Sequence, residues 1–201
     1  SSNSATSIAL TSYARAINYP LATSSGGDIH SGYFNLQVNN GFRVTGITFS
    51  GTLAGELQPA LARTDPGYDG AAGSATNSAN MGISLGSEVS SDDLGRNNVD
   101  HSNINGNRQF SLSLNHLNVT GEKTLRIGVA GFYSSENAYW TYASGDAYYS
   151  GVDLSYASIA LLNPTLTIYT APVPEPETYG MMLAGLAGLA FVIRRRRAAN
   201  A

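Results

Sequence analysis

The chain of 201 residues carries 11 Lys and Arg against 14 Asp and Glu, a formal net charge of -3. Residues 171–201 hold four arginines and two glutamates, which leaves 7 basic and 12 acidic residues, a net of -5, in the rest of the chain. Binding of nucleic acid needs a basic surface, so we expect no nucleic-acid partner. The chain has no cysteine, which excludes disulfides and thiolate chemistry.

Apolar and polar residues alternate in several segments of the first 170 residues. In the clearest case Phe110, Leu112 and Leu114 alternate with polar neighbours. A period of two with one polar face predicts half-buried antiparallel strands. We therefore predict that residues 1–170 form one all-β domain, an antiparallel two-sheet sandwich of jelly-roll type. The expected strands lie in 4–10, 34–38, 45–49, 81–85, 110–114, 125–129, 154–162 and 165–168, with a helical turn in 11–18.

Long polar stretches separate these strands, and two of them contain clustered aspartates. We expect loops at residues 58–80, 87–107 and 134–151. Carboxylates such as those of Asp65 and Asp69, or of Asp92, Asp93 and Asp100, are ligands that Ca²⁺ prefers. Neither cluster has EF-hand spacing, and aspartate is also an ordinary turn residue. We expect no metal or cofactor, with Ca²⁺ as the one candidate ion.

Catalytic motifs are not apparent in the sequence. His30, His101 and His116 are scattered and do not have the spacing of metal ligands. No Gly-x-Ser-x-Gly motif occurs, and the body glutamates Glu56, Glu88, Glu122 and Glu136 stand in no recognisable pair. We therefore expect a protein that is not an enzyme and has no catalytic residues.

Aromatic residues concentrate in residues 132–149. Tyrosine and tryptophan offer flat apolar faces with a polar rim, which suits the stacking of sugar rings. The candidate glycan-binding residues are Tyr139, Trp140, Tyr142, Tyr148 and Tyr149. The alternative interpretation is that these rings cap one end of the sandwich or pack a long hairpin.

The last 31 residues differ in composition from the body. Residues 171–178 form a Pro-rich linker, residues 179–193 contain no charged side chain, and residues 194–201 begin with Arg194, Arg195, Arg196 and Arg197. An uncharged helix of this length is about 22 Å long, short of a roughly 30 Å hydrocarbon core. Arginines can reach lipid headgroups and keep their end of a helix on the cytoplasmic side. We therefore predict a transmembrane helix at 179–193 and an Arg-rich cytoplasmic tail at 194–201.

The order of these features resembles the PEP-CTERM sorting signal of Gram-negative bacteria. The resemblance rests on Val173, Pro174, Glu175 and Pro176, the short apolar helix and the terminal arginines, and it is confined to the tail. It implies processing by an exosortase, a membrane sorting enzyme. We accordingly expect a signal peptide before Ser1, an inner-membrane intermediate with the body in the periplasm, and delivery to the cell surface or extracellular matrix.

Three functions are consistent with these features. The first is a non-catalytic surface or matrix protein with a structural or adhesive role in exopolysaccharide and biofilm. The second is a carbohydrate-binding module, with or without Ca²⁺. The third is an exported hydrolase, which would need acids or a Ser-His pair to converge in a pocket.

Overall fold

The computed structural model describes residues 4–86, 93–173 and 180–187. The strands pair only in antiparallel fashion, which confirms the expected all-β antiparallel class. The elements of the body are β1 (Ser4–Ala9), α1 (Thr11–Ala16), β2 (Asn18–Ala22), β3 (Gly26–Gln37), β4 (Phe42–Gln58), β5 (Tyr68–Gly70), β6 (Ser74–Gly86), β7 (Asp93–Ser102), β8 (Gly106–Leu114), β9 (Glu122–Glu136), β10 (Ala138–Ser144), β11 (Ala147–Asp153) and β12 (Tyr156–Pro172).

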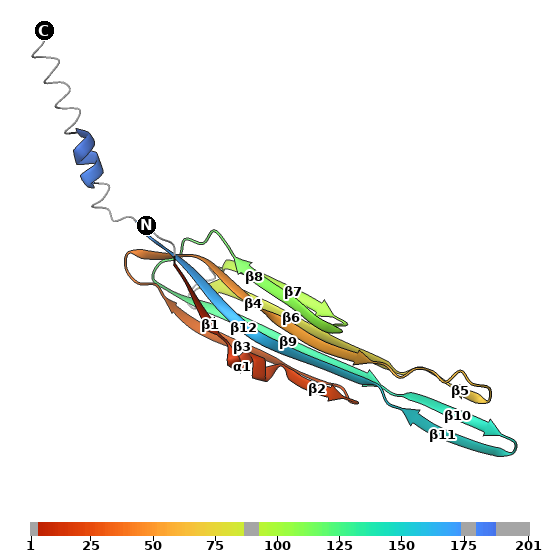
Figure 1. Cartoon of the computed structure of the whole chain (residues 1–201). Coiled ribbons are helices and arrows are strands. Elements are labelled where there is room, and N and C mark those ends of the chain that lie inside the picture. The colour runs from red at the N-terminus through yellow and green to blue at the C-terminus, as the bar shows by residue number, and fades with distance from the viewer. Residues whose placement is uncertain (1–3, 87–92, 174–179, 188–201) are drawn as a thin grey trace, which may run out of the picture.

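Two sheets pack face to face along the length of the body (Figure 1). Sheet A has the order β1-β12-β4-β8, with β2 also paired to β12. Sheet B has the order β3-β9-β6-β7. The contacts between β12 and both β9 and β6 hold one sheet against the other, as do those between β4 and β6. The expected sandwich is therefore present in the body, and its last strand continues to Pro172.

The core lies between the sheets and follows the period of two in the strands. Ile47 and Phe49 of sheet A are fully buried, as is Ile127 of sheet B. Burial of such side chains stabilises the fold by roughly 1.5–3 kcal/mol each. Rings meet at their edges in this layer, for example Phe49 and Phe110 at a centroid distance of 5.2 Å. The alternating pattern therefore predicts both the positions of these strands and which face of each strand points into the core.

A short helix interrupts the edge of sheet A and helps to close the core. Strands β1 and β2 pair with different parts of β12, and α1 lies between them. Tyr13 of this helix is 2% exposed, and its hydroxyl donates a hydrogen bond of 3.2 Å to the Ile127 carbonyl of sheet B. Burial raises the pKa of the Tyr13 phenol. Gly32 of β3 leaves room for this hydroxyl, because a Cβ there would lie 2.2 Å from it.

One buried amide bridges the two sheets. Asn77 of β6 is 3% exposed, and its Nδ2 donates to the Ser158 carbonyl of β12 and to the Ile104 carbonyl, both at 2.8 Å. Its Oδ1 accepts from the Ile104 backbone N–H at 2.6 Å. The Asn77 side chain therefore links β6 of sheet B to β12 of sheet A and to the β7–β8 connection.

The stretches expected to be loops contain strands, so that part of the prediction is wrong. Strand β6 begins at Ser74 inside the 58–80 stretch, and β7 occupies most of the described part of 87–107. The 134–151 stretch contains β10 and most of β11. With β5 these two strands form a third, three-stranded sheet beyond the sandwich. The helical turn expected at 11–18 is present as α1.

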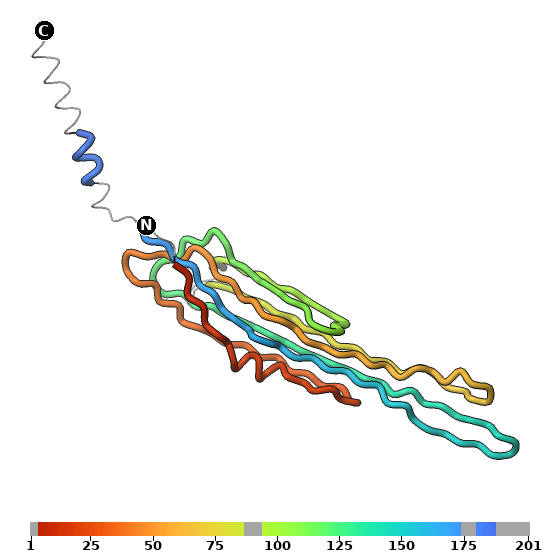
Figure 2. The backbone as a smooth tube through the Cα atoms, in the orientation of Figure 1, coloured from red at the N-terminus to blue at the C-terminus, as the bar shows by residue number. Residues whose placement is uncertain are grey.

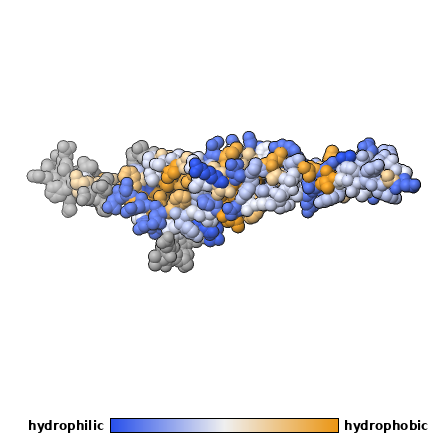
Figure 3. Space-filling view, turned by 90° about the horizontal axis from the view of Figure 1, so that it is seen from below, coloured by the Kyte–Doolittle hydropathy of each residue, from blue (hydrophilic) through white to orange (hydrophobic). Residues whose placement is uncertain are grey.

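Polar residues cover much of the face shown in Figure 3. In Figure 3 the molecule is elongated, and apolar residues lie in separate groups among polar ones rather than in one continuous band. Exposed large apolar side chains of the body include Ile29, Tyr33 and Phe132. Scattered exposed apolar side chains are normal on soluble surfaces.

Replacing Asn77 with alanine should lower the free energy of unfolding by about 2–4 kcal/mol, because the Ile104 N–H, the Ile104 carbonyl and the Ser158 carbonyl would each lose a hydrogen bond. Urea denaturation of the full chain followed by circular dichroism measures this change. Asn35 of β3 is exposed, so Asn35→Ala should change stability by less than about 0.5 kcal/mol. Equal stability of the two variants would contradict the bridging role of Asn77.

Candidate functional site

The aromatic cluster expected from the sequence lies in the third sheet, which we call the arm (β5, β10 and β11). Strands β10 and β11 form a hairpin with Ser144 opposite Ala147, so Gly145 and Asp146 make a two-residue turn. Gly145 has a φ of 60°, which glycine adopts at no steric cost. Figure 2 shows this hairpin extending past the sandwich as a continuation of β9 and β12. The arm therefore connects a strand of sheet B to a strand of sheet A.

A buried serine attaches the arm to the sandwich. Ser155 is 0% exposed, its Oγ accepts from the Ala60 N–H at 2.9 Å, and its own N–H donates to Asn137 Oδ1 at 3.0 Å. Gly73 packs against it so closely that a Cβ would lie 2.2 Å from the Ser155 Oγ. The residues on both sides of β5, at the end of β9 and at the start of β12 are thus tied together at the base of the arm.

One face of the arm is a packed aromatic row. Tyr68, Tyr142 and Tyr149 lie at paired positions on β5, β10 and β11. The centroids of Tyr68 and Tyr142 are 4.6 Å apart, and those of Tyr142 and Tyr149 are 6.3 Å apart. Trp140 lies beside them, with its ring over Gly151, where a Cβ would be 2.3 Å from the Trp140 Cζ2.

Arg63, in the loop before β5, packs against the rings of this row. Its guanidinium lies 4.2 Å from the Trp140 ring centroid and 5.2 Å from that of Tyr68. It also donates to both carboxylate oxygens of Asp153, from Nε and Nη2, at 2.8 Å each. These hydrogen bonds hold the pKa of the Asp153 carboxyl below its usual value and raise the pKa of Arg63. The arm has little core of its own, and this arrangement joins the loop before β5 to β10 and to the end of β11.

The opposite face of the arm is open. Tyr139 and Tyr148 are 68% and 81% exposed there. A shallow hollow of about 590 Å³ lies on the arm, with Asp69, Tyr139, Thr141, Ser150 and Val152 among its lining residues. It offers an aromatic face, two hydroxyls and a carboxylate, a combination suited to hydrogen bonding and stacking with a sugar.

The structure divides the five candidate glycan-binding residues between the two faces. Trp140, Tyr142 and Tyr149 belong to the aromatic row, as the hairpin-packing alternative expects, although Tyr149 at its edge is 56% exposed. Tyr139 and Tyr148 lie on the open face. Sequence reasoning did not identify Arg63, Tyr68 or Asp153 as members of the cluster. The Gly-Asp dipeptide at 145–146 is a hairpin signal that could have placed β10 and β11.

The candidate Ca²⁺ ligands do not form a recognisable cluster in the part of the chain that the structure describes, where no group of three or more His, Asp or Glu side chains could hold a metal ion. Asp65 and Asp69 belong to the segment around β5, and Asp92 lies outside the described residues. His30 lies edge-on to the buried Tyr13 ring, with centroids 4.7 Å apart. The absence of a cofactor therefore stays an expectation.

Only part of the C-terminal tail is described. Val173 follows β12, and its N–H donates to the Gly41 carbonyl at 2.8 Å. Pro174, Glu175, Pro176 and the four arginines from Arg194 lie outside the described residues. Residues 180–187 form a helix (Figure 1). Its side chains are exposed. Among the described residues, no helix combines the length and the apolar character needed to cross a membrane.

Replacing Arg63 with alanine should expose Trp140, the only tryptophan of the chain, and shift its fluorescence emission to longer wavelength. The Asp153 pKa lies below its ordinary value of 3.8, so the pairing persists in weak acid and is lost as the pH falls through the lowered pKa. In the unaltered chain the emission should therefore stay constant from neutral pH to about pH 4 and shift only below it.

Arg108 of β8 is exposed and lies in sheet A, so Arg108→Ala is the matched control for loss of one arginine. Its emission should equal that of the unaltered chain at every pH. An unchanged emission maximum in Arg63→Ala, with the far-ultraviolet circular dichroism also unchanged, would show that Arg63 does not shield Trp140.

Comparison with known proteins finds a family match in the tail. Residues 172–197 match the family model described as the PEP-CTERM protein-sorting motif, a range that includes both the Pro-Glu-Pro segment and the four arginines. This match confirms the resemblance noted in the tail and supports an exported protein that is sorted by an exosortase. No curated protein matches the chain.

Among solved structures, two of infectious bursal disease virus are similar to the body only in a general way. A VP2 subviral particle has 10% identity and a TM-score of 0.31, over 86% of this chain and 37% of that chain. The Gx strain structure has 12% identity and a TM-score of 0.29, over 87% of this chain and 38% of that chain. The chain thus spans less than two-fifths of either viral protein.

Proposed function

We propose that this protein is a non-catalytic component of the bacterial surface or extracellular matrix, delivered by processing of its PEP-CTERM tail. The observation that carries the proposal is the match of residues 172–197 to the sorting motif, directly after the last strand of a β-sandwich. A structural or adhesive role in exopolysaccharide and biofilm suits a body whose outer faces are largely polar. Exosortase is the expected processing partner.

The tail is proposed to enter the inner membrane before processing. In the described helix over 180–187, Met181, Met182, Leu183 and Leu186 expose more than half of their surface. Exposed apolar side chains on a helix favour transfer into lipid at roughly 25 cal/mol per Å². The flanking arginines then keep their end on the cytoplasmic side, which leaves the body in the periplasm. Cleavage near Pro174 to Pro176 would separate the body from this anchor.

A second candidate function is carbohydrate binding by the open face of the arm. It is supported by the hollow of about 590 Å³ beside Tyr139. The packed row on the opposite face fixes the position of β10, so the exposed tyrosines are presented by a rigid support. Such a module would suit the adhesive role, because it would attach the delivered body to the polysaccharide around the cell.

Replacing Glu175 with alanine should retain the protein in the inner-membrane fraction, because the charged centre of the Pro-Glu-Pro motif would be absent. Cell fractionation followed by immunoblotting measures the released share. Glu177→Ala removes the neighbouring carboxylate outside the Pro-Glu-Pro core and should be released normally. Normal release of Glu175→Ala would show that the motif is incidental to sorting.

Replacing Tyr139 with alanine should weaken binding to a polysaccharide ligand by about tenfold, since stacking of a ring on an aromatic face is worth about 1–2 kcal/mol. A glycan array with the full chain identifies the ligand, and titration measures the loss. Tyr169 of β12 is an exposed tyrosine on the sandwich, 42% exposed, so Tyr169→Ala is the control. An array without any bound glycan would exclude this second function.

A further inference from the structure

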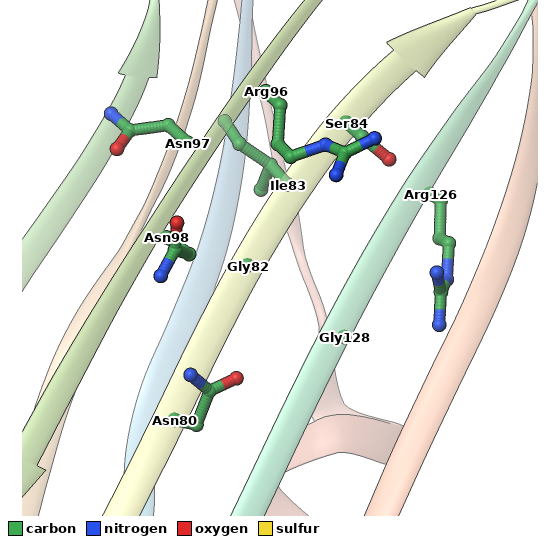
Figure 4. Close-up of a pocket in the computed structure, with 9 residues that line it drawn as sticks. All are labelled: Asn80, Gly82, Ile83, Ser84, Arg96, Asn97, Asn98, Arg126 and Gly128. Carbon is green, nitrogen blue, oxygen red and sulfur yellow. The ribbon is translucent and has the colours of Figure 1, made fainter.

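The outer face of sheet B contains a polar hollow that is separate from the arm. It has a volume of about 390 Å³ and is lined by residues of β6, β7 and β9 (Figure 4). The outward side chains of these strands alternate with the buried Met81, Ile83 and Leu85. Gly82 pairs with both Asn98 and Gly128, and Ser84 pairs with both Arg96 and Arg126. The hollow therefore crosses three neighbouring strands in two adjacent rows.

Two glycines form the floor of the hollow. Gly82 and Gly128 are paired positions on β6 and β9. A Cβ added at Gly82 would meet nothing closer than 3.8 Å, and one at Gly128 would meet the Ser31 Oγ at 3.4 Å. Glycine in the interior of a strand weakens it, and one reason for its presence is the close approach of a ligand to the backbone. Because these residues lack side chains, the backbone of the sheet is directly exposed at the floor of the hollow.

Arginines and amides surround this floor. In Figure 4 the Arg96 side chain extends to Ser84, and the Arg126 side chain runs beside β9 toward the level of Gly128. Arg126 also lies over the exposed Tyr33 ring, at 5.8 Å from its centroid. At the other end, the Asn80 amide donates to the Asp100 carboxylate. Among the nine described residues that line the hollow, none is acidic, although the body as a whole has an excess of acidic residues.

We propose that this hollow binds a carboxylated sugar unit of an acidic polysaccharide. The Arg126 guanidinium can bind a carboxylate through paired hydrogen bonds, and Asn98 and Ser84 offer donors and acceptors for ring hydroxyls. The volume lies within the roughly 300–1,000 Å³ of small-molecule sites, which suits a sugar ring better than a small inorganic anion. The choice of a polymer as the source of the sugar rests on the proposed surface location.

Calorimetric titration of the purified full chain in mild detergent tests the proposal, with oligogalacturonate as the probe. We expect binding that weakens as salt is added, and none with an uncharged maltooligosaccharide of equal length. Arg126→Gln should weaken binding by about tenfold or more, because a charge-assisted hydrogen bond is lost. Gly82→Ile should also abolish binding by filling the hollow, without unfolding the chain, because its side chain enters open space.

Arg108→Gln makes the same change of charge in sheet A and should bind as the unaltered chain does. Equal affinities of Arg126→Gln and Arg108→Gln, or no binding of oligogalacturonate, would overturn the proposal. Competition by sodium sulfate at the same concentration as the oligosaccharide would also overturn it in favour of a site for inorganic anions. The assay uses purified protein, so its outcome is independent of whether Glu175→Ala affects sorting.

Discussion

The burial of one apolar face from each of two sheets is the constraint on which the rest of the structure depends. Ile47 and Phe49 on one side and Met81 and Ile127 on the other are nearly or fully buried. Since side chains in a strand alternate between faces, filling this layer forces the polar residues outward. The arginines and glycines of the sheet B hollow are on the surface for that reason. Asn77 of sheet B is a polar exception, and its hydrogen bonds reach β12 of sheet A and the β7–β8 connection.

The arm is formed beyond the ends of the same strands, but different interactions stabilise it. Strands β9 and β10 are separated by one residue, and β11 and β12 by two, so the arm prolongs the sandwich past the point where the sheets face each other. Without a second sheet to cover it, the packing of Trp140 depends on Arg63, Asp153 and the tyrosine row. Packing thereby covers Trp140 and Tyr142 on one face, while Tyr139 and Tyr148 on the other face are exposed.

The sequence predicted well the strands that alternate strongly, and poorly those that do not. Phe110, Leu112 and Leu114 form a regular apolar face and were placed correctly in a buried strand. Strand β7 has Val99 as one of few apolar inward residues and lies at a sheet edge, where both faces can be polar. The arm strands expose tyrosines on both faces, so no alternation marks them.

The candidate sites also differ in how well the sequence could predict them. The tail could be recognised from sequence because its motif is a local order of residue types, which the match to residues 172–197 confirms. The hollow on sheet B could not, since its glycines and arginines come from three strands that are brought together only by register. Clustering of aromatics in the sequence indicated the arm but not the division of Trp140 and Tyr139 between opposite faces.

We propose that the PEP-CTERM tail directs the protein out of the cell and is then removed. Mass spectrometry of the C-terminal peptide from the mature, surface-released protein tests it most directly. The account predicts a chain that ends near Pro174 to Pro176, with the sandwich through Pro172 intact. A mature extracellular form that retains Arg194 to Arg197 would contradict it.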